Sequence, residues 1–155
     1  MTFKAVALAP EQFVSWARLT DDELESRSAR RRVADRQPGF PCRVSLQDAA
    51  PGDRLILLPY EHHAVDSPYR AAGPIYVREN AQRWQEPLDV VPPVLRTRLL
   101  SVRAYDVRGM IEDADVVQGE ALEERIESMF ANTAIDYVHV HFARHGCYAC
   151  RIERA

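Results

Sequence analysis

The sequence predicts an α+β fold: a single domain with a largely antiparallel sheet, N-terminal helices, one late amphipathic helix and a closing β-hairpin. Segments that alternate polar and apolar residues are separated by Pro, Gly and Asp residues typical of turns. Segments with helical spacing occur only near the start and late in the chain, so strands are joined mainly to strands. At 155 residues, 46% hydrophobic and 28% charged, the chain suits one globular domain over residues 1–155.

The N-terminal part predicts one strand and two short helices. Residues 3–9 form the strand, and Pro10 suits the first turn of the helix that follows. Thr20 caps the second helix, because its hydroxyl can accept from the free amides of the acidic residues after it. We expect the basic run RSARRR, residues 27–32, to be the solvated end of that helix.

The middle of the chain predicts a series of strands. CRVSL alternates like a half-buried strand, and the apolar run in RLILLPY favours the centre of the sheet. The predicted strands are residues 42–46, 54–60, 75–78, 99–107 and 110–117, with residues 84–93 as a long surface connection.

Residues 119–132 predict the amphipathic helix. Leu122, Ile126, Met129 and Phe130 share one stripe, while four glutamates face water. We therefore do not interpret these carboxylates as an acid/base site.

Composition limits the partners. A net charge of −3 gives no general attraction to nucleic acid, and no apolar run is long enough to span a bilayer. Three cysteines, an odd number, favour reduced thiols in the cytoplasm. No phosphate loop or dinucleotide motif is present, so the sequence points to no cofactor.

The stretch HVHFARHGCYACRI, residues 139–152, predicts a terminal hairpin. A three-residue turn ending at Gly146, which can adopt a left-handed backbone, pairs Phe142 with Tyr148 and Val140 with Cys150. One face is then apolar and includes Cys150. His139, His141 and Cys147 lie on the other face.

These side chains define a candidate site. His62 follows the predicted central strand, and DSPYR after it resembles a helix cap whose amides would face the same loop. We expect a small polar or anionic ligand, bound by a domain that could act as an enzyme. The candidate residues are His62, His139, His141, Cys147, Arg43 and Tyr69.

Three alternatives stay open. His139 and His141 could hold a metal ion, because alternate strand residues share a face, but further ligands would have to come from elsewhere. They could also be two exposed histidines on an open sheet. Finally, the same face or a free strand edge could form a protein-interaction or homodimer surface with no catalytic activity.

Several segments carry a family resemblance. They are PGFPCRVSL, LLPYEH, SPYR, GPIYVRE, LSVRAYD, ADVV and HVHFARHGCYACRIERA, which extend from Pro38 to the C-terminus. In these segments the chain resembles a bacterial family known as domain of unknown function 1203. The resemblance implies a compact bacterial cytoplasmic protein and assigns no activity to any residue.

Overall fold

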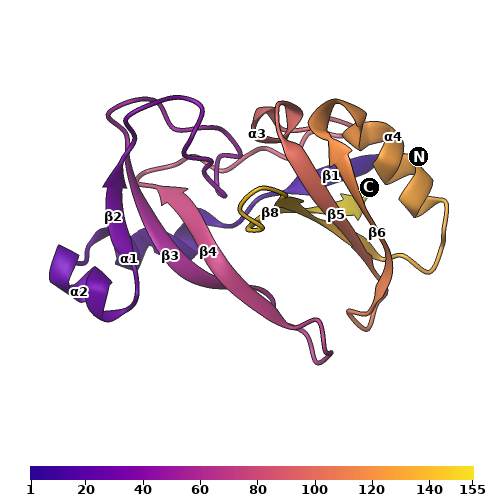
Figure 1. Ribbon diagram of the computed structural model, residues 1–155, viewed down its shortest axis with the longest axis horizontal. Helices are drawn as coiled ribbons and strands as arrows, with labels where there is room; N and C mark the ends of the chain where they lie inside the picture. The colour runs from indigo at the N-terminus through magenta and orange to yellow at the C-terminus, as the bar shows by residue number, and fades with distance from the viewer.

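The computed structural model describes residues 1–155 and contains two antiparallel sheets. The three-stranded sheet has the order β2-β3-β4, and the five-stranded sheet has the order β1-β8-β7-β5-β6. Figure 1 shows the small sheet with α1 and α2 at one end of the molecule, and the large sheet with α3 and α4 at the other. The elements are β1 (Phe3–Val6), η1 (Pro10–Phe13), α1 (Val14–Ala17), α2 (Asp21–Ser26), β2 (Arg30–Val33), β3 (Arg54–His63), β4 (Ala71–Arg78), α3 (Pro93–Arg96), β5 (Leu99–Tyr105), β6 (Ile111–Gln118), η2 (Gly119–Ala121), α4 (Leu122–Phe130), β7 (Tyr137–Phe142) and β8 (Tyr148–Arg154).

The predicted α+β class is confirmed, including the N-terminal helices and the closing hairpin. Thr20 caps α2 as predicted, since its Oγ1 accepts from the Glu23 amide at 3.2 Å. None of the helices has the length and apolar character needed to cross a membrane.

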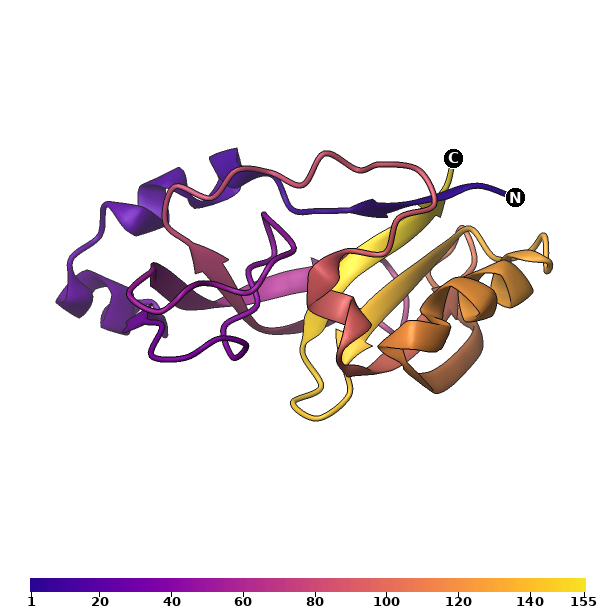
Figure 2. The same cartoon turned by 90° about the horizontal axis from the view of Figure 1, so that it is seen from above.

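The large sheet has one apolar face, and α4 covers it. The predicted stripe of Leu122, Ile126, Met129 and Phe130 is fully buried against that face. Each such side chain contributes about 1.5–3 kcal/mol through burial. Figure 2 shows α3 and α4 together along this side of the sheet, and the two chain ends next to each other. Antiparallel pairing of β1 with β8 explains the proximity of the ends.

Gly119 is required where β6 leads into α4. A Cβ atom there would lie 1.9 Å from the carbonyl oxygen of Leu95 in α3. The close approach of these two backbones brings α3 against the start of α4, and only glycine permits it.

Two sequence predictions in the N-terminal half are wrong. The basic run expected at a helix end is there only at Arg27, the C-cap of α2, and its remaining arginines lie in β2, an edge strand paired with β3. The segment 42–46 is not a strand, because the chain turns there: the Leu46 amide donates to Cys42 O and Leu46 has a φ of 51°. All five of its residues are buried, so its alternation does not mark a buried and an exposed face; Cys42 and Val44 lie in one core cluster and Leu46 in another.

The hairpin prediction is correct in the middle and wrong at the turn. Val140 pairs with Cys150, as predicted, and His139 pairs with Arg151. However, the register shifts after Val140, so that His141 rather than Phe142 lies opposite Tyr148. Gly146 has the predicted left-handed conformation, with a φ of 79°. The turn is longer than predicted, because the Phe142 amide already donates to Cys147 O.

Candidate functional site

The polar face of the large sheet is covered by the end of β3. His139 and His141 alternate with apolar residues along β7 and point away from the α4 side. The ring of His62, from β3, lies 6.2 Å from that of His139 and 5.0 Å from that of His141. The two histidines of β7 are therefore not on an open sheet face, and they are only 2% and 1% exposed.

A β-bulge in β3 turns two consecutive histidines toward the same sheet. The pairing of β3 with β4 shifts between Tyr60 and His63. Consecutive residues of a regular strand point to opposite faces, but a bulge re-aims a side chain. As a result, the rings of both His62 and His63 contact His139.

The register shift in the hairpin adds an aromatic wall. Placing Tyr148 opposite His141 brings its ring parallel to that of His62, at 5.2 Å and an interplanar angle of 7°. Tyr148 is also buried, and burial raises its pKa. Stacking against a rigid buried phenol limits the orientations available to His62.

The histidine triad, His62, His139 and His141, brings three imidazole nitrogens within 4.8 Å of one another. Five buried side-chain polar atoms of the protein have no hydrogen-bond partner, and three of them are His62 Nδ1, His139 Nδ1 and His141 Nε2. A buried polar atom without a partner costs about 1–3 kcal/mol. Concentration of that cost in one cluster is typical of a binding site rather than of a structural core.

One hydrogen bond fixes the orientation of the His141 ring. Its Nδ1 lies 3.0 Å from the carbonyl oxygen of Gly146. A carbonyl can only accept, so Nδ1 carries the hydrogen and Nε2 keeps its lone pair toward the cluster. Backbone anchoring of the far ring nitrogen is how proteins orient a metal-binding imidazole.

The triad is uncharged at neutral pH. Burial is the main cause that lowers the pKa of His139 to about 2 and that of His62 to about 4. Burial lowers the pKa of His141 to about 3, against an opposing effect of its bond to Gly146. All three rings therefore offer a free lone pair at pH 7.

The charged side chains with the largest effect on the triad are basic. Arg103 and Arg43 act on His141, and Arg151 acts on His139. Arg103 and Arg151 are the cross-strand neighbours of His139 on its two sides. Arg151 is neutralised by Glu153 at 2.7 Å, whereas no ion pair includes Arg103.

His63 has a different environment from the triad. Its Nδ1 lies 2.8 Å from Tyr69 O, and its Nε2 lies 2.6 Å from the Tyr137 hydroxyl. The carbonyl must accept from Nδ1, which leaves Nε2 to accept from the phenol. Both nitrogens are thus used, and His63 packs beside the triad without a free ligand atom.

The other predicted site residues lie outside the triad. Arg43 is buried and donates to Tyr148 O at 2.7 Å and to the Cys147 sulfur at 3.2 Å. Cys147 packs against the main core. Tyr69 contributes its carbonyl to His63, and its own ring is 39% exposed. No helix follows His63: Ser67 instead bridges the Tyr69 amide and the Gly109 carbonyl.

Cys150 has the structural role that the sequence predicts. It is 1% exposed in the main core, and burial raises its pKa to about 12. A thiol with that pKa is neither a nucleophile nor a ready metal ligand at pH 7.

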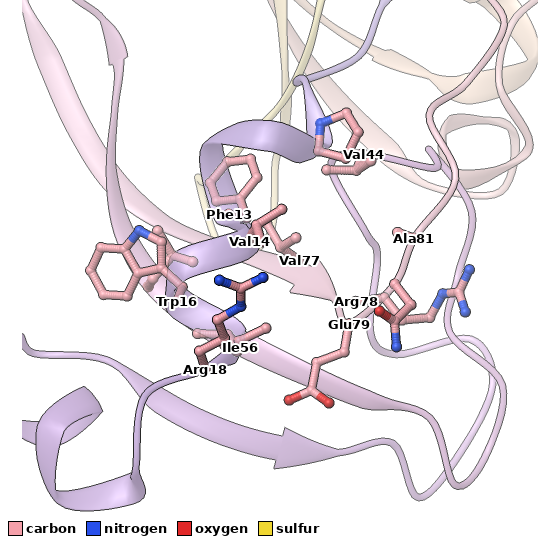
Figure 3. A pocket seen from close by; sticks show the side chains of 14 residues that line it. Phe13, Val14, Trp16, Arg18, Val44, Ile56, Val77, Arg78, Glu79 and Ala81 are labelled. Carbon is pink, nitrogen blue, oxygen red and sulfur yellow. The ribbon is translucent and has the colours of Figure 1, made fainter.

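A separate cavity of about 250 Å³ lies between the N-terminal helices and the small sheet. Phe13, Val14 and Trp16 of the N-terminal helices and Ile56 and Val77 of the small sheet are among the residues that line it (Figure 3). The charges at its rim are Arg18, Arg78 and Glu79, and no histidine or cysteine lines it. This cavity therefore offers no imidazole or thiol group.

Sequence reasoning missed Arg103 and Tyr148 as members of the site. The alternation of Ser101, Arg103 and Tyr105 was visible, but nothing in the sequence indicates that β5 pairs with β7. Tyr148 reaches the site only through the register shift.

The fold and the site together define the class: an α+β protein of two antiparallel sheets that enclose a partly buried three-histidine cluster. Residues 39–154 match the family described as "Protein of unknown function (DUF1203)", and the chain belongs to this family. No curated protein and no solved structure matches the chain significantly.

Proposed function

We propose that this protein binds a divalent transition-metal ion through His62, His139 and His141, and that a small polar or anionic molecule occupies the remaining position on the metal. The observation that carries the proposal is the convergence of three imidazole nitrogens, one from each ring, within 4.8 Å. Each of the three rings also has a buried nitrogen without a hydrogen-bond partner. Nitrogen ligands of a tetrahedral zinc ion lie about 3.3 Å apart, as follows from Zn–N bonds of about 2.0–2.1 Å. Small ring movements would close the cluster around an ion.

The ligand set favours particular metals. Neutral imidazoles suit zinc, copper, nickel, cobalt or iron, whereas calcium and magnesium prefer oxygen ligands. Three protein ligands with one open position are typical of catalytic rather than structural zinc sites. A metal held in this way lowers the pKa of a bound water, which supports an enzymatic role.

The test uses untagged protein, stripped with a chelator and reloaded with Zn(II) or Co(II). We expect one bound metal per chain in the wild type and loss of binding in His62→Gln, since His62 is the most accessible of the three ligands. His145→Gln is the matched control, because His145 is exposed in the hairpin turn. Less than stoichiometric metal in the wild type, or full binding by His62→Gln, would overturn the proposal.

We also propose that the protein works in the bacterial cytoplasm, without a nucleic-acid or membrane partner. None of the three cysteines is in a disulfide, which supports a reducing compartment. The net charge of −3 supports a small-molecule rather than a nucleic-acid partner.

The second candidate function is a non-catalytic interaction or homodimer surface. The free edge of β6 favours it, because Val116 is 57% exposed there. Asp113 and Asp115 of the same strand act against edge pairing. Light scattering tests the two: a dimer that Val116→Lys converts to a monomer with unchanged metal content would support the edge as an interface.

A further inference from the structure

We infer that Arg103 is the anion-recognising residue of the triad site, and that the ligand is a small oxyanion, a carboxylate or phosphate, held between the metal and the Arg103 guanidinium. This inference rests on the proposed metal site and names the class of molecule that it takes.

The charge of the metal-loaded triad favours a negatively charged ligand. The triad supplies three neutral ligands, so a bound divalent ion keeps its full charge of about +2. Two arginines, Arg103 and Arg151, are also the cross-strand neighbours of His139. Such a site is completed by a negatively charged ligand, because an excess of buried positive charge is costly without one.

Arg103 is the side chain that would contact this ligand. Arg103 pairs with His139 across β5 and β7, on the same face as the triad. Cross-strand neighbours have Cβ atoms about 4.5–5.5 Å apart. Arg103 also acts electrostatically on His62 and His141, which supports a position of its charge near the triad.

Arg103 has no acidic partner. The Arg103 Nε donates to Ser101 Oγ at 3.3 Å, and the residue also faces the phenol of Tyr105. Both are neutral groups, and no ion pair includes Arg103. Arg151, on the opposite side of His139, has Glu153 at 2.7 Å and lies over the Tyr137 ring at 3.7 Å. Of these two arginines, only Arg103 is free to neutralise a ligand.

The geometry of the guanidinium then selects the ligand. Its planar donors match two oxygens of one carboxylate or phosphate group, while a third interaction places an oxygen on the metal. Chloride lacks the paired oxygens and can use only the metal.

The experiment titrates Co(II)-loaded protein with acetate, inorganic phosphate and chloride, and follows the Co(II) absorption spectrum and the heat of binding. Wild type should bind acetate or phosphate, and the stronger of the two distinguishes a carboxylate from a phosphate ligand. Arg103→Met should lower that affinity by about tenfold to 100-fold, the range for charge-assisted hydrogen bonds. It should keep one Co(II) per chain and change chloride binding much less.

Arg151→Met is the matched control, since it removes the neutralised arginine on the other side of the same histidine. Its oxyanion affinity should stay within about threefold of the wild type. Wild-type protein that holds Co(II) but does not respond to acetate or phosphate would overturn the inference about Arg103 alone. Equal oxyanion binding by Arg103→Met and wild type would do the same. Protein that holds no stoichiometric Co(II) would overturn the metal site and this inference together.

Discussion

His62 and His63 are adjacent in the chain and differ in almost every physical respect. His63 is 2% exposed, and both of its nitrogens have hydrogen-bond partners within 2.8 Å. His62 is half-buried, and its buried Nδ1 has no partner. The same bulge therefore presents two histidines with different roles: His62 points into the triad, and His63 stabilises the fold.

The comparison shows that hydrogen-bond saturation, and not burial, separates the two kinds of histidine. His139 is as buried as His63, yet its Nδ1 has no partner. A saturated imidazole stabilises the fold, whereas an unsaturated one costs stability until a ligand uses the lone pair. Matched substitutions at His139 and His63 should therefore have opposite consequences.

The largest expected effect is on metal affinity. His139→Leu removes one of three ligands and should weaken Zn(II) binding by about 1,000-fold, or about 4 kcal/mol. His63→Leu should change the affinity by less than about tenfold, since His63 bonds to neither His62 nor the β7 histidines. Competition with a chromophoric chelator measures both constants. Equal losses in the two variants would remove the distinction between the sites.

The second effect, on the metal-free fold, should have the reverse order. His63→Leu leaves the Tyr137 hydroxyl and the Tyr69 carbonyl without their partner, which should cost about 2–4 kcal/mol. His139→Leu replaces a ring with an unpaired nitrogen by an apolar side chain of similar volume, and should change stability by less than about 1 kcal/mol. Urea unfolding after chelator treatment measures both. The idea fails if His139→Leu is the more destabilising variant.

The third effect is the response to acid. The folded pKa values of His139 and His141, about 2 and about 3, lie below the unfolded value of about 6.5. Below pH 6.5 the unfolded chain binds protons that the folded protein does not, so metal-free stability falls as the pH falls. It should be constant above that pH.

Each of these two histidines should contribute a slope that approaches about 1.4 kcal/mol per pH unit near pH 5. His139→Leu should have a shallower slope than the wild type, and His145→Gln an unchanged one. Urea midpoints between pH 4.5 and 8 give the slopes. Stability that is flat down to pH 4.5 would show that the triad accepts protons freely.

The sequence predicted most elements but only part of the site, for a physical reason. Alternation along β7 placed His139 and His141 on one face, and the end of the RLILLPY strand pointed to His62. These were local patterns of period two. The contacts that complete the site arise from two register shifts and from pairing between strands distant in sequence. A register shift leaves no local pattern, because a bulge adds one residue and requires no particular residue type. Pairing between distant strands leaves none either, because it depends on segments far apart in the sequence.

The position of Arg43 also could not be predicted from a local pattern. Residues 42–46 alternate as a strand would, but the left-handed conformation of Leu46 reverses the chain. Arg43 is thereby directed between Pro41 O and Tyr148 O, instead of onto an open polar face. Alternation of polar and apolar residues therefore does not establish a strand here, because the whole segment is buried and its apolar side chains pack into two separate clusters.

The smallest effect concerns the second contact of His63. Tyr137→Phe removes only the hydroxyl that bonds to His63 Nε2, and keeps the ring that packs against His139 and carries Arg151 on its face. One hydrogen bond between neutral groups contributes about 1 kcal/mol, so the metal-free protein should lose about that amount. Zn(II) affinity should stay within about threefold of the wild type, because the aromatic ring that packs against His139 is preserved. A drop in metal affinity as large as that of His139→Leu would show that the His63–Tyr137 pair positions the triad. His63 would then belong with the ligand-binding histidines and not with the structural ones.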